Sequence, residues 1–164
     1  MDKLTREWFG EARQKSFGEL ATEAKKNPEH YIKIQIDDYC SYVPILYSVV
    51  PLGKERAERH GFVYIITDGE FVKIGQTKNV ENRLVSIQCG NPREISVLQI
   101  IETQDMGAVE QSLHWWYGRY HVRGEWFDLM PVFFNPQNSD VKTSDSFLKK
   151  LTRAKEKRAL RKVS

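Results

Sequence analysis

The chain has 164 residues, a net charge of +3, 40% hydrophobic and 12% aromatic residues, which suffices for one compact domain with extensions. No apolar run is long enough to span a bilayer and the first residues do not resemble a signal peptide, so we expect a cytoplasmic protein. Cys40 and Cys89 lack the paired spacing of metal ligands. This pattern argues against zinc and favours two reduced thiols.

The first sixty residues read as an extension that packs on a following domain. Apolar residues at helical spacing predict amphipathic helical turns up to about Lys26, ended by Asn27-Pro28. Residues 31–36 alternate like a strand, and Asp37-Asp38 closes it. We interpret the acidic pair as a solvated turn rather than a metal site, because adjacent side chains on an extended chain point to opposite sides. The apolar residues 39–52 are expected to pack on the next sheet.

Residues 62–74 predict a β-hairpin. Asp68-Gly69 separates two runs rich in branched and aromatic residues, which is a strong hairpin signal. If these two residues form the loop, Tyr64 lies directly opposite Lys73. Because side chains alternate between faces, both belong to one face, and the other face is expected to join the core. The predicted core-facing residues are Val63, Ile65, Val72 and Ile74.

A first helix follows the hairpin. Thr77 and Asn79 are both suitable N-cap residues, and Arg83 falls within the apolar stripe of this helix. The guanidinium must therefore find a partner near the hairpin. A surface ion pair with Glu81 or Glu70 is the plain structural alternative. The buried stripe is expected to consist of Val80, Leu84 and Ile87.

A third strand and a second helix complete this region. The β-branched residues 95–101 predict a central strand. Asp105 can cap the next helix, on which Glu110 and His114 lie one turn apart and project from the same face. Its buried stripe is expected to consist of Met106, Val109, Leu113, Trp116 and Tyr120.

In the order of these motifs, residues 61–129 resemble a GIY-YIG nuclease domain, and within that superfamily the branch named after a T5 phage open reading frame, T5orf172. Tyr64 matches the tyrosine of the first motif, and Lys73-Ile74-Gly75 matches the second motif in the form that this branch uses. Arg83 matches the arginine of the following helix. Glu110 is the candidate for the carboxylate that a later helix supplies.

Two further segments resemble the same branch, namely His114 and Gly124-Glu125-Trp126-Phe127. We expect the aromatic residues of the second segment to pack back on the sheet. Glu125 could support the site residues or hydrogen-bond to main chain, and the structural role is the preferred interpretation. The chain departs from the wider superfamily in two places. Phe62-Val63-Tyr64 stands where the superfamily has Gly-Ile-Tyr, and Lys73 replaces the tyrosine of the second motif.

The expected fold is α+β, with a small three-stranded antiparallel sheet flanked by helices, as the resemblance to GIY-YIG domains implies. We assign residues 1–60 to the N-terminal extension, 61–134 to the nuclease-like domain and 135–164 to a linker and basic tail. The resemblance further implies a metal-dependent endonuclease that hydrolyses phosphodiester bonds in DNA. Such an endonuclease would be of the type encoded by phages or bacterial mobile elements.

Five side chains carry the expected chemistry. Glu110 would hold one Mg²⁺ or Mn²⁺, cations that prefer oxygen ligands and retain several waters. Arg83 would stabilise charge on the phosphate oxygens. Tyr64 would be the base or would orient water, with Lys73 and Arg83 favouring its phenolate. His114 is a second candidate for proton transfer.

The C-terminal tail supplies the basic character of the chain. Residues 147–164 contain eight basic residues and one acidic residue, so that residues 1–146 sum to −4. Apolar residues at helical spacing favour a basic helix. The tail has two interpretations, which we weigh equally. It either contacts the phosphates of double-stranded DNA or is merely solvated. The residues predicted to contact nucleic acid are Lys149, Lys150, Arg153, Lys157, Arg158 and Arg161.

Two other hypotheses remain open. The chain could be a catalytically inactive module that binds nucleic acid or a protein as an accessory or regulatory factor. Cleavage would require Glu110 and a divalent ion, whereas binding would respond mainly to salt and to truncation of the tail. The third hypothesis assigns a protein partner to the basic tail or to the N-terminal segment.

Overall fold

The computed structural model describes residues 10–45 and 59–134. The predictions for residues 1–9, for residues 46–58 and for the basic tail from residue 135 onwards lie outside these ranges. None of the helices in the described ranges has the length and apolar content needed to cross a bilayer. The helices are α2 (Phe17–Lys26), α3 (Val80–Cys89), α4 (Met106–Trp116) and α5 (Met130–Phe133), with 3₁₀ turns η1 (Pro28–His30) and η4 (Gly118–Tyr120). The strands are β1 (Tyr31–Ile36), β2 (Tyr39–Pro44), β3 (Gly61–Thr67), β4 (Val72–Thr77), β5 (Ser96–Thr103), β6 (His121–Arg123) and β7 (Trp126–Phe127).

The architecture is α+β, as predicted, but the main sheet has five strands instead of three. Its order is β5-β3-β4-β7-β6, and all neighbouring strands are antiparallel. The two additional strands come from the segment around Gly124, which folds as a short hairpin against β4. Val72 lies opposite Phe127, and Lys73 lies opposite Trp126. The strands β1 and β2 form a separate hairpin.

The strand β5 lies at the edge of the sheet, so its predicted central position is wrong. It pairs with β3 alone within the sheet. Val97 and Ile100 remain exposed on it, although its β-branched sequence suggested burial on both faces. The amide of Gln99 bonds to the main chain of β1, accepting from Gln35 N–H at 3.0 Å and donating to Lys33 C=O at 3.0 Å.

The hairpin of β3 and β4 forms as predicted, but its register differs by two residues. Tyr64 lies opposite Gly75, and Lys73 lies opposite Ile66, so the predicted pairing of Tyr64 with Lys73 is wrong. A shift by two residues leaves every side chain on its predicted face, since the side-chain period of a strand is two. Tyr64 and Lys73 therefore still share one face, as the alternation predicted.

The shift arises because the loop contains four residues, 68–71, instead of two. Oδ1 of Asp68 accepts from the backbone N–H groups of Glu70 at 2.9 Å and Phe71 at 2.8 Å. The Thr67 hydroxyl accepts from Gly69 N–H at 3.0 Å and donates to Phe71 C=O at 2.7 Å. These side-chain bonds satisfy the main chain of a longer turn, with Gly69 at a φ of 91°.

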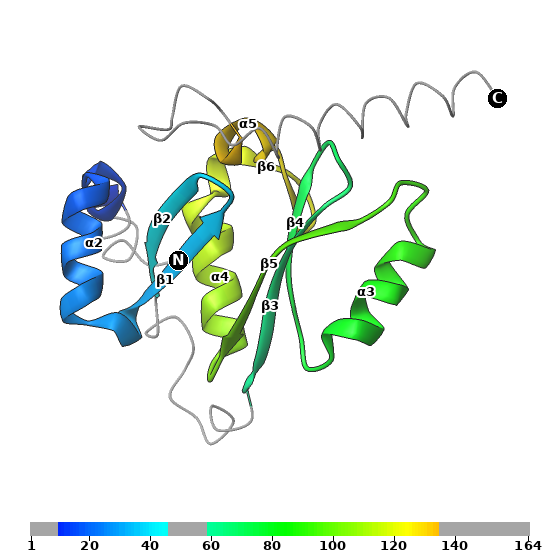
Figure 1. Ribbon diagram of the computed structural model, residues 1–164, viewed down its shortest axis with the longest axis horizontal. Coiled ribbons are helices and arrows are strands. Elements are labelled where there is room, and N and C mark those ends of the chain that lie inside the picture. The colour runs from blue at the N-terminus through cyan, green and yellow to red at the C-terminus, as the bar shows by residue number, and fades with distance from the viewer. Residues whose placement is uncertain (1–9, 46–58, 135–164) are drawn as a thin grey trace.

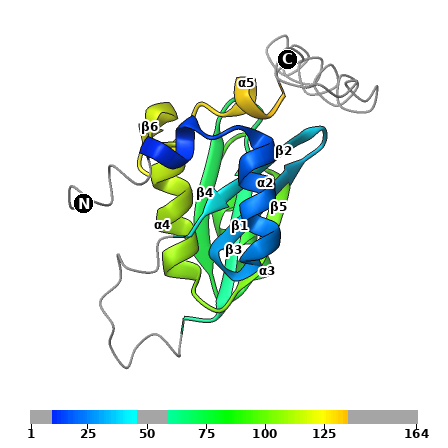
Figure 2. The same ribbon diagram turned by 90° about the vertical axis from the view of Figure 1, so that its left-hand side faces the viewer.

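One face of the five-stranded sheet, which we call the core face, carries Val63, Ile65, Val72 and Ile74. Figures 1 and 2 show α4 and the β1–β2 hairpin on this side, with α2 outside the hairpin. The hairpin contributes fully buried side chains such as Ile34 and Val43 to the same hydrophobic cluster as Val63 and Leu113. The described part of the N-terminal segment therefore shares one hydrophobic core with the sheet.

The N-terminal elements follow their local sequence signals. Helix α2 begins after Ser16, whose hydroxyl accepts from Glu19 N–H while the Glu19 carboxylate accepts from Ser16 N–H, and Asn27 caps its end. The strand β1 and the following turn form as predicted, with Asp37 at a φ of 47°. Arg13 also donates to the C=O groups of Trp115 and Trp116 at the end of α4. The extension is therefore tied to the domain by polar contacts as well as by its core residues.

The opposite face, which we call the α3 face, carries Tyr64, Ile66, Lys73 and Gly75. Helix α3 lies on this side of the sheet (Figure 1). Asn79 caps α3 by accepting from Asn82 N–H at 2.9 Å, as predicted. The predicted stripe of Val80, Leu84 and Ile87 faces the sheet but is only partly buried, and Val85 outside the stripe is 60% exposed. The α3 face thus combines a tightly buried strand surface with a lightly packed helix.

Candidate active site

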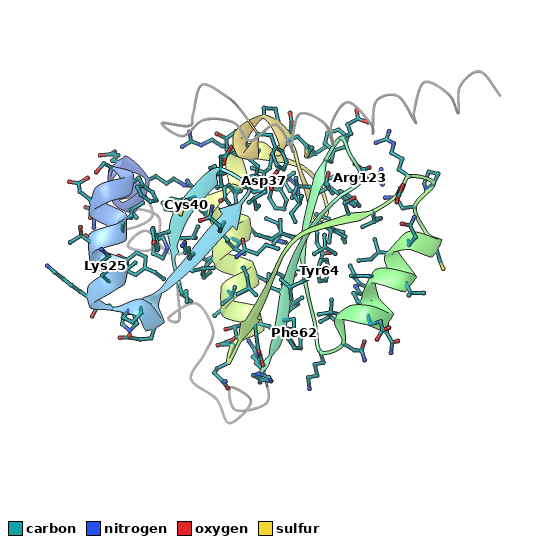
Figure 3. The ribbon with its side chains drawn as sticks, in the orientation of Figure 1. Lys25, Asp37, Cys40, Phe62, Tyr64 and Arg123 are labelled. Atoms are coloured by element: carbon teal, nitrogen blue, oxygen red, sulfur yellow. The ribbon has the colours of Figure 1, made fainter. Side chains whose placement is uncertain are left out.

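Tyr64 is the central polar residue of the α3 face. Its side chain is fully buried, and its ring lies across Gly75 on the neighbouring strand, so that a Cβ at residue 75 would overlap the Tyr64 hydroxyl. Arg83 Nε donates to this hydroxyl at 3.2 Å. Figure 3 shows Tyr64 between the sheet and α3. The second motif therefore needs glycine at position 75 to accommodate the first-motif tyrosine.

The ionisation of Tyr64 differs from the sequence-based expectation. Burial raises the pKa of the Tyr64 phenol above its usual value, and the hydrogen bond and charge of Arg83 only partly oppose this effect. Lys73 was expected to favour the phenolate, but it lies opposite Ile66 and its ammonium is bound by Glu125. Burial thus disfavours the phenolate of Tyr64, and of the two predicted cations Arg83 alone is seen to lower the pKa of this phenol.

Lys73 is held on two sides. Its Nζ donates to Glu125 Oε2 at 2.5 Å and lies 5.5 Å from the centroid of the Trp126 ring. The Lys73 side chain is only 13% exposed. The short hairpin of β6 and β7 supplies both partners, because Trp126 pairs with Lys73 in the sheet. Glu125 thus contacts a predicted site residue directly, beyond the structural role expected for it.

Glu110 projects from α4 toward β4. Its Oε2 accepts from Gln76 Nε2 at 2.8 Å. Burial raises the pKa of the Glu110 carboxyl to about 7, and the negative charge of Glu125 adds to this rise. The Gln76 hydrogen bond and the charges of Lys73 and Arg83 oppose it. These electrostatic interactions place Glu110 in the same neighbourhood as the charged groups of the α3 face.

His114 lies one turn further along α4 and also contacts β4. Its Nε2 is 2.8 Å from the C=O of Ile74. Because a carbonyl oxygen only accepts, Nε2 must carry the hydrogen, which leaves Nδ1 as the acceptor nitrogen of the neutral ring. The imidazole packs edge-on against Phe127 at a centroid distance of 5.1 Å. Glu110 and His114 therefore share one helix face, as predicted, and that face is turned toward β4.

The strand β4 extends beyond its neighbour β7, so side chains on the core face and on the α3 face can approach one another there. The ladder between β4 and β7 covers only Val72 and Lys73, with one further bond from Ile74 N–H to Glu125 C=O at 3.1 Å. The residues from Gly75 to Thr77 extend beyond β7. Side chains from α3, from α4 and from the β6–β7 turn meet at this protruding strand end. The five residues predicted as catalytic are brought together around β4, although His114 bonds to main chain.

These donors fit a divalent ion only if that ion needs a single protein carboxylate. Within residues 10–45 and 59–134, no group of three or more His, Cys, Asp or Glu side chains could hold a metal ion. The Glu110 carboxyl, whose raised pKa reflects burial and a neighbouring negative charge, would gain from a cation. One carboxylate fits Mg²⁺ or Mn²⁺, which retain several waters, and does not fit zinc.

Three residues of this arrangement were missed or misjudged in the sequence analysis. Glu125 and Trp126 hold Lys73, and Gln76 bonds to Glu110. Gln76 directly follows the second motif and lies at the exposed end of its strand. This position could have indicated that its side chain contacts a site residue. Glu125 had a weaker signal, because 52 residues separate it from Lys73.

Comparison with known protein families identified the domain family of this chain. The model of the T5orf172 domain matches residues 61–150, which is more than half of the chain. No curated protein and no solved structure matches the chain. The matched range contains all five side chains predicted as catalytic as well as Glu125.

Proposed function

The chain belongs to the T5orf172 domain family, whose nuclease-like modules are associated with nucleic acids, and we propose that it is a metal-dependent endonuclease acting on double-stranded DNA. The reaction adds water to phosphorus and breaks one P–O ester bond. We further propose a cytoplasmic role of phage or bacterial mobile-element type, on the strength of family membership alone.

The observation that carries the proposal is the convergence of four side chains around β4. Arg83 bonds to Tyr64 above Gly75, while Lys73, near the start of β4, and Glu110 interact electrostatically with each other. Two cationic groups beside a phenol and a carboxylate form a site suited to an anionic phosphodiester. An ordinary core would not concentrate such groups around one glycine.

Arg83 and Tyr64 would act on the phosphate as a unit. Arg83 uses Nε to hold the phenol oxygen, which leaves the two terminal nitrogens of the guanidinium for phosphate oxygens. Because burial disfavours the phenolate and the oxygen accepts from Arg83, the O–H of Tyr64 would donate to the substrate or to the attacking water. We therefore propose that Tyr64 orients groups by hydrogen bonding, in preference to acting as a general base.

Glu110 is the residue that would hold a divalent ion, and the ion would supply Lewis-acid stabilisation of the phosphate charge. Binding of the ion would require Glu110 in its ionised form, which the raised pKa makes sensitive to pH near neutrality. His114 is the candidate for proton transfer through Nδ1, since Nε2 is engaged with Ile74 C=O.

The alternative is a module that binds nucleic acid without cutting it. Lys73 in place of the second-motif tyrosine favours this alternative. It requires the cationic groups Lys73 and Arg83 but has no need of Glu110. The two hypotheses thus predict different effects of removing the Glu110 carboxylate on DNA cleavage and DNA binding.

The test is cleavage of supercoiled plasmid by the wild type and by Glu110→Ala in Mg²⁺, Mn²⁺ or EDTA, with gel-shift binding to the same DNA. The matched control is Glu102→Ala, which removes a carboxylate of β5 that pairs with His60 and whose side chain is 65% exposed. We expect metal-dependent nicking by the wild type and the control, and DNA binding without nicking by Glu110→Ala. Binding without cutting by all three proteins would favour the binding module.

A further inference from the structure

The ammonium of Lys73 is confined more closely than that of a typical lysine near a protein surface. It contacts the Glu125 carboxylate at 2.5 Å and the face of the Trp126 ring at 5.5 Å. An unrestrained lysine side chain samples many rotamers, whereas these two partners restrict Nζ to one region. The position of this charge is therefore determined by residues 124–126 as much as by the β4 strand.

The segment that carries Glu125 is itself fixed by the main chain. Gly124 adopts a φ of 56°, and its C=O lies 2.8 Å from Nε2 of His121. The C=O of Glu125 accepts from Ile74 N–H at 3.1 Å. Because Lys73 and Ile74 are consecutive, the same turn bonds to the strand beneath it and to the ammonium beside it. This arrangement orients Glu125 before any substrate binds.

A second ion pair in the molecule provides a contrast. Arg93 contacts Asp68 at 3.1 Å and Glu70 at 2.6 Å at the hairpin loop, and its side chain is 39% exposed. Those residues fix a turn. The pair of Lys73 and Glu125 instead lies within the site, since the charge of Glu125 acts on Tyr64, Arg83 and Glu110.

We propose that Glu125 is a positioning residue that holds the Lys73 ammonium where the scissile phosphate binds. This inference rests on the proposed function and identifies how the site uses lysine in place of the second-motif tyrosine. Glu125 does not contact the phosphate. The phosphate approaches an ammonium that is already placed, so less side-chain freedom remains to be lost on the way to the transition state.

The test is a double-mutant cycle of Lys73→Met, Glu125→Gln and the combined variant, with Glu70→Gln as a control that removes a carboxylate from the Arg93 pair. Glu125→Gln keeps the shape of the side chain and removes its charge. We expect it to lower kcat about 10- to 100-fold in the wild-type background, with a smaller change in KM. In the Lys73→Met background we expect no further loss, because there is no ammonium left to position.

Three outcomes would overturn the inference. An equal loss of kcat in both backgrounds would mean that Glu125 acts through the fold or by itself. Unchanged or faster cleavage by Glu125→Gln would mean that the carboxylate merely repels DNA. A loss of the same size in Glu70→Gln would mean that general charge, and not placement, controls the rate.

The failure of the proposed function can be distinguished from the failure of this inference. If the wild type binds DNA without cutting it, the same cycle is measured by fluorescence anisotropy with a labelled duplex. Non-additive effects of Lys73→Met and Glu125→Gln on Kd would then support placement of the ammonium for phosphate binding. Additive effects would overturn it.

Discussion

The two faces of the five-stranded sheet are buried by different means. The core face is covered by α4 and the β1–β2 hairpin, and its cluster consists almost entirely of aliphatic and aromatic side chains. The α3 face buries Tyr64 completely and nearly buries Lys73, although α3 itself has no fully buried residue. The core face thus supplies stability through apolar area, whereas the α3 face keeps polar groups partly removed from water.

Groups with a raised pKa lie on both sides of the sheet, since Tyr39 and Tyr117 in the core show the same direction of shift as Tyr64 and Glu110. Burial is the leading cause of the raised pKa of both Tyr64 and Glu110. Such groups cost folding free energy when they ionise, and the apolar core must offset that cost. Substitutions on the two faces separate the cost of ionising buried groups from the stabilisation that the apolar core provides.

The largest expected effect on stability comes from the core face. Ile34→Ala removes a fully buried side chain of the N-terminal hairpin and should lower the free energy of unfolding by about 2–5 kcal/mol. Val85→Ala on α3, where the side chain is 60% exposed, should change it by less than about 0.5 kcal/mol. Urea denaturation followed by circular dichroism measures both. Equal losses would show that the hairpin is no more important to the core than α3.

A substitution at Gly75 should affect both stability and activity. Gly75→Ala places a methyl group where the Tyr64 hydroxyl lies, so we expect a loss of about 1–3 kcal/mol from overpacking and a fall in cleavage of about 100-fold from displacement of the phenol. Gly118→Ala is the control, since a Cβ there meets nothing within 4 Å. Wild-type cleavage by Gly75→Ala would contradict the placement of Tyr64 across this residue.

Two buried tyrosines allow the same chemical change to be made on each face. Tyr117→Phe removes a hydroxyl that lies 3.1 Å from that of Tyr39 in the core, which should cost about 1 kcal/mol of stability and leave cleavage unchanged. Tyr64→Phe should instead lower kcat about 100- to 1,000-fold, as loss of a transition-state donor does, with a similar loss of stability of about 1 kcal/mol because its hydroxyl accepts from Arg83. Plasmid cleavage and thermal melts of both variants check this. Loss of cleavage in Tyr117→Phe would remove the functional distinction between the faces.

The smallest expected effect is a pH dependence of stability. The pKa of Glu110 is raised from an ordinary 4.5 to about 7 in the folded state, so the folded state retains a proton that the unfolded state has lost. This contribution is fully present below about pH 4.5 and is lost as pH rises through about 7. Because the carboxyl is partly solvated, we expect a loss of about 1 kcal/mol.

The matched variant for this effect is Glu110→Gln, measured in EDTA by urea denaturation from about pH 5 to 8. Its stability should lack the decline that the wild type shows across this window. At the upper end it should equal or exceed the wild type, because the glutamine stays neutral while still able to accept from Gln76. Parallel pH curves for the two proteins would rule out the raised pKa.

Prediction from the sequence succeeded where the signal was local. The N-cap roles of Asn79 and Asp105 followed from residue type and position, and their side chains make the expected bonds to the main chain. The face of each residue in β3 and β4 also followed from alternation, and remained correct after the register shifted by two. The loop itself was misjudged because the Asp68 side chain stabilises a longer turn.

The sequence by itself determined the α+β class, the family, and the face on which Tyr64 and Lys73 lie, because these depend on residue type and spacing along short segments. Only the tertiary structure decided that β5 is an edge strand, that Glu125 reaches Lys73 across 52 residues, and that burial raises the pKa of Tyr64. Strand order, burial and long-range charge contacts depend on how all elements pack at once. No local pattern of residues contains that information.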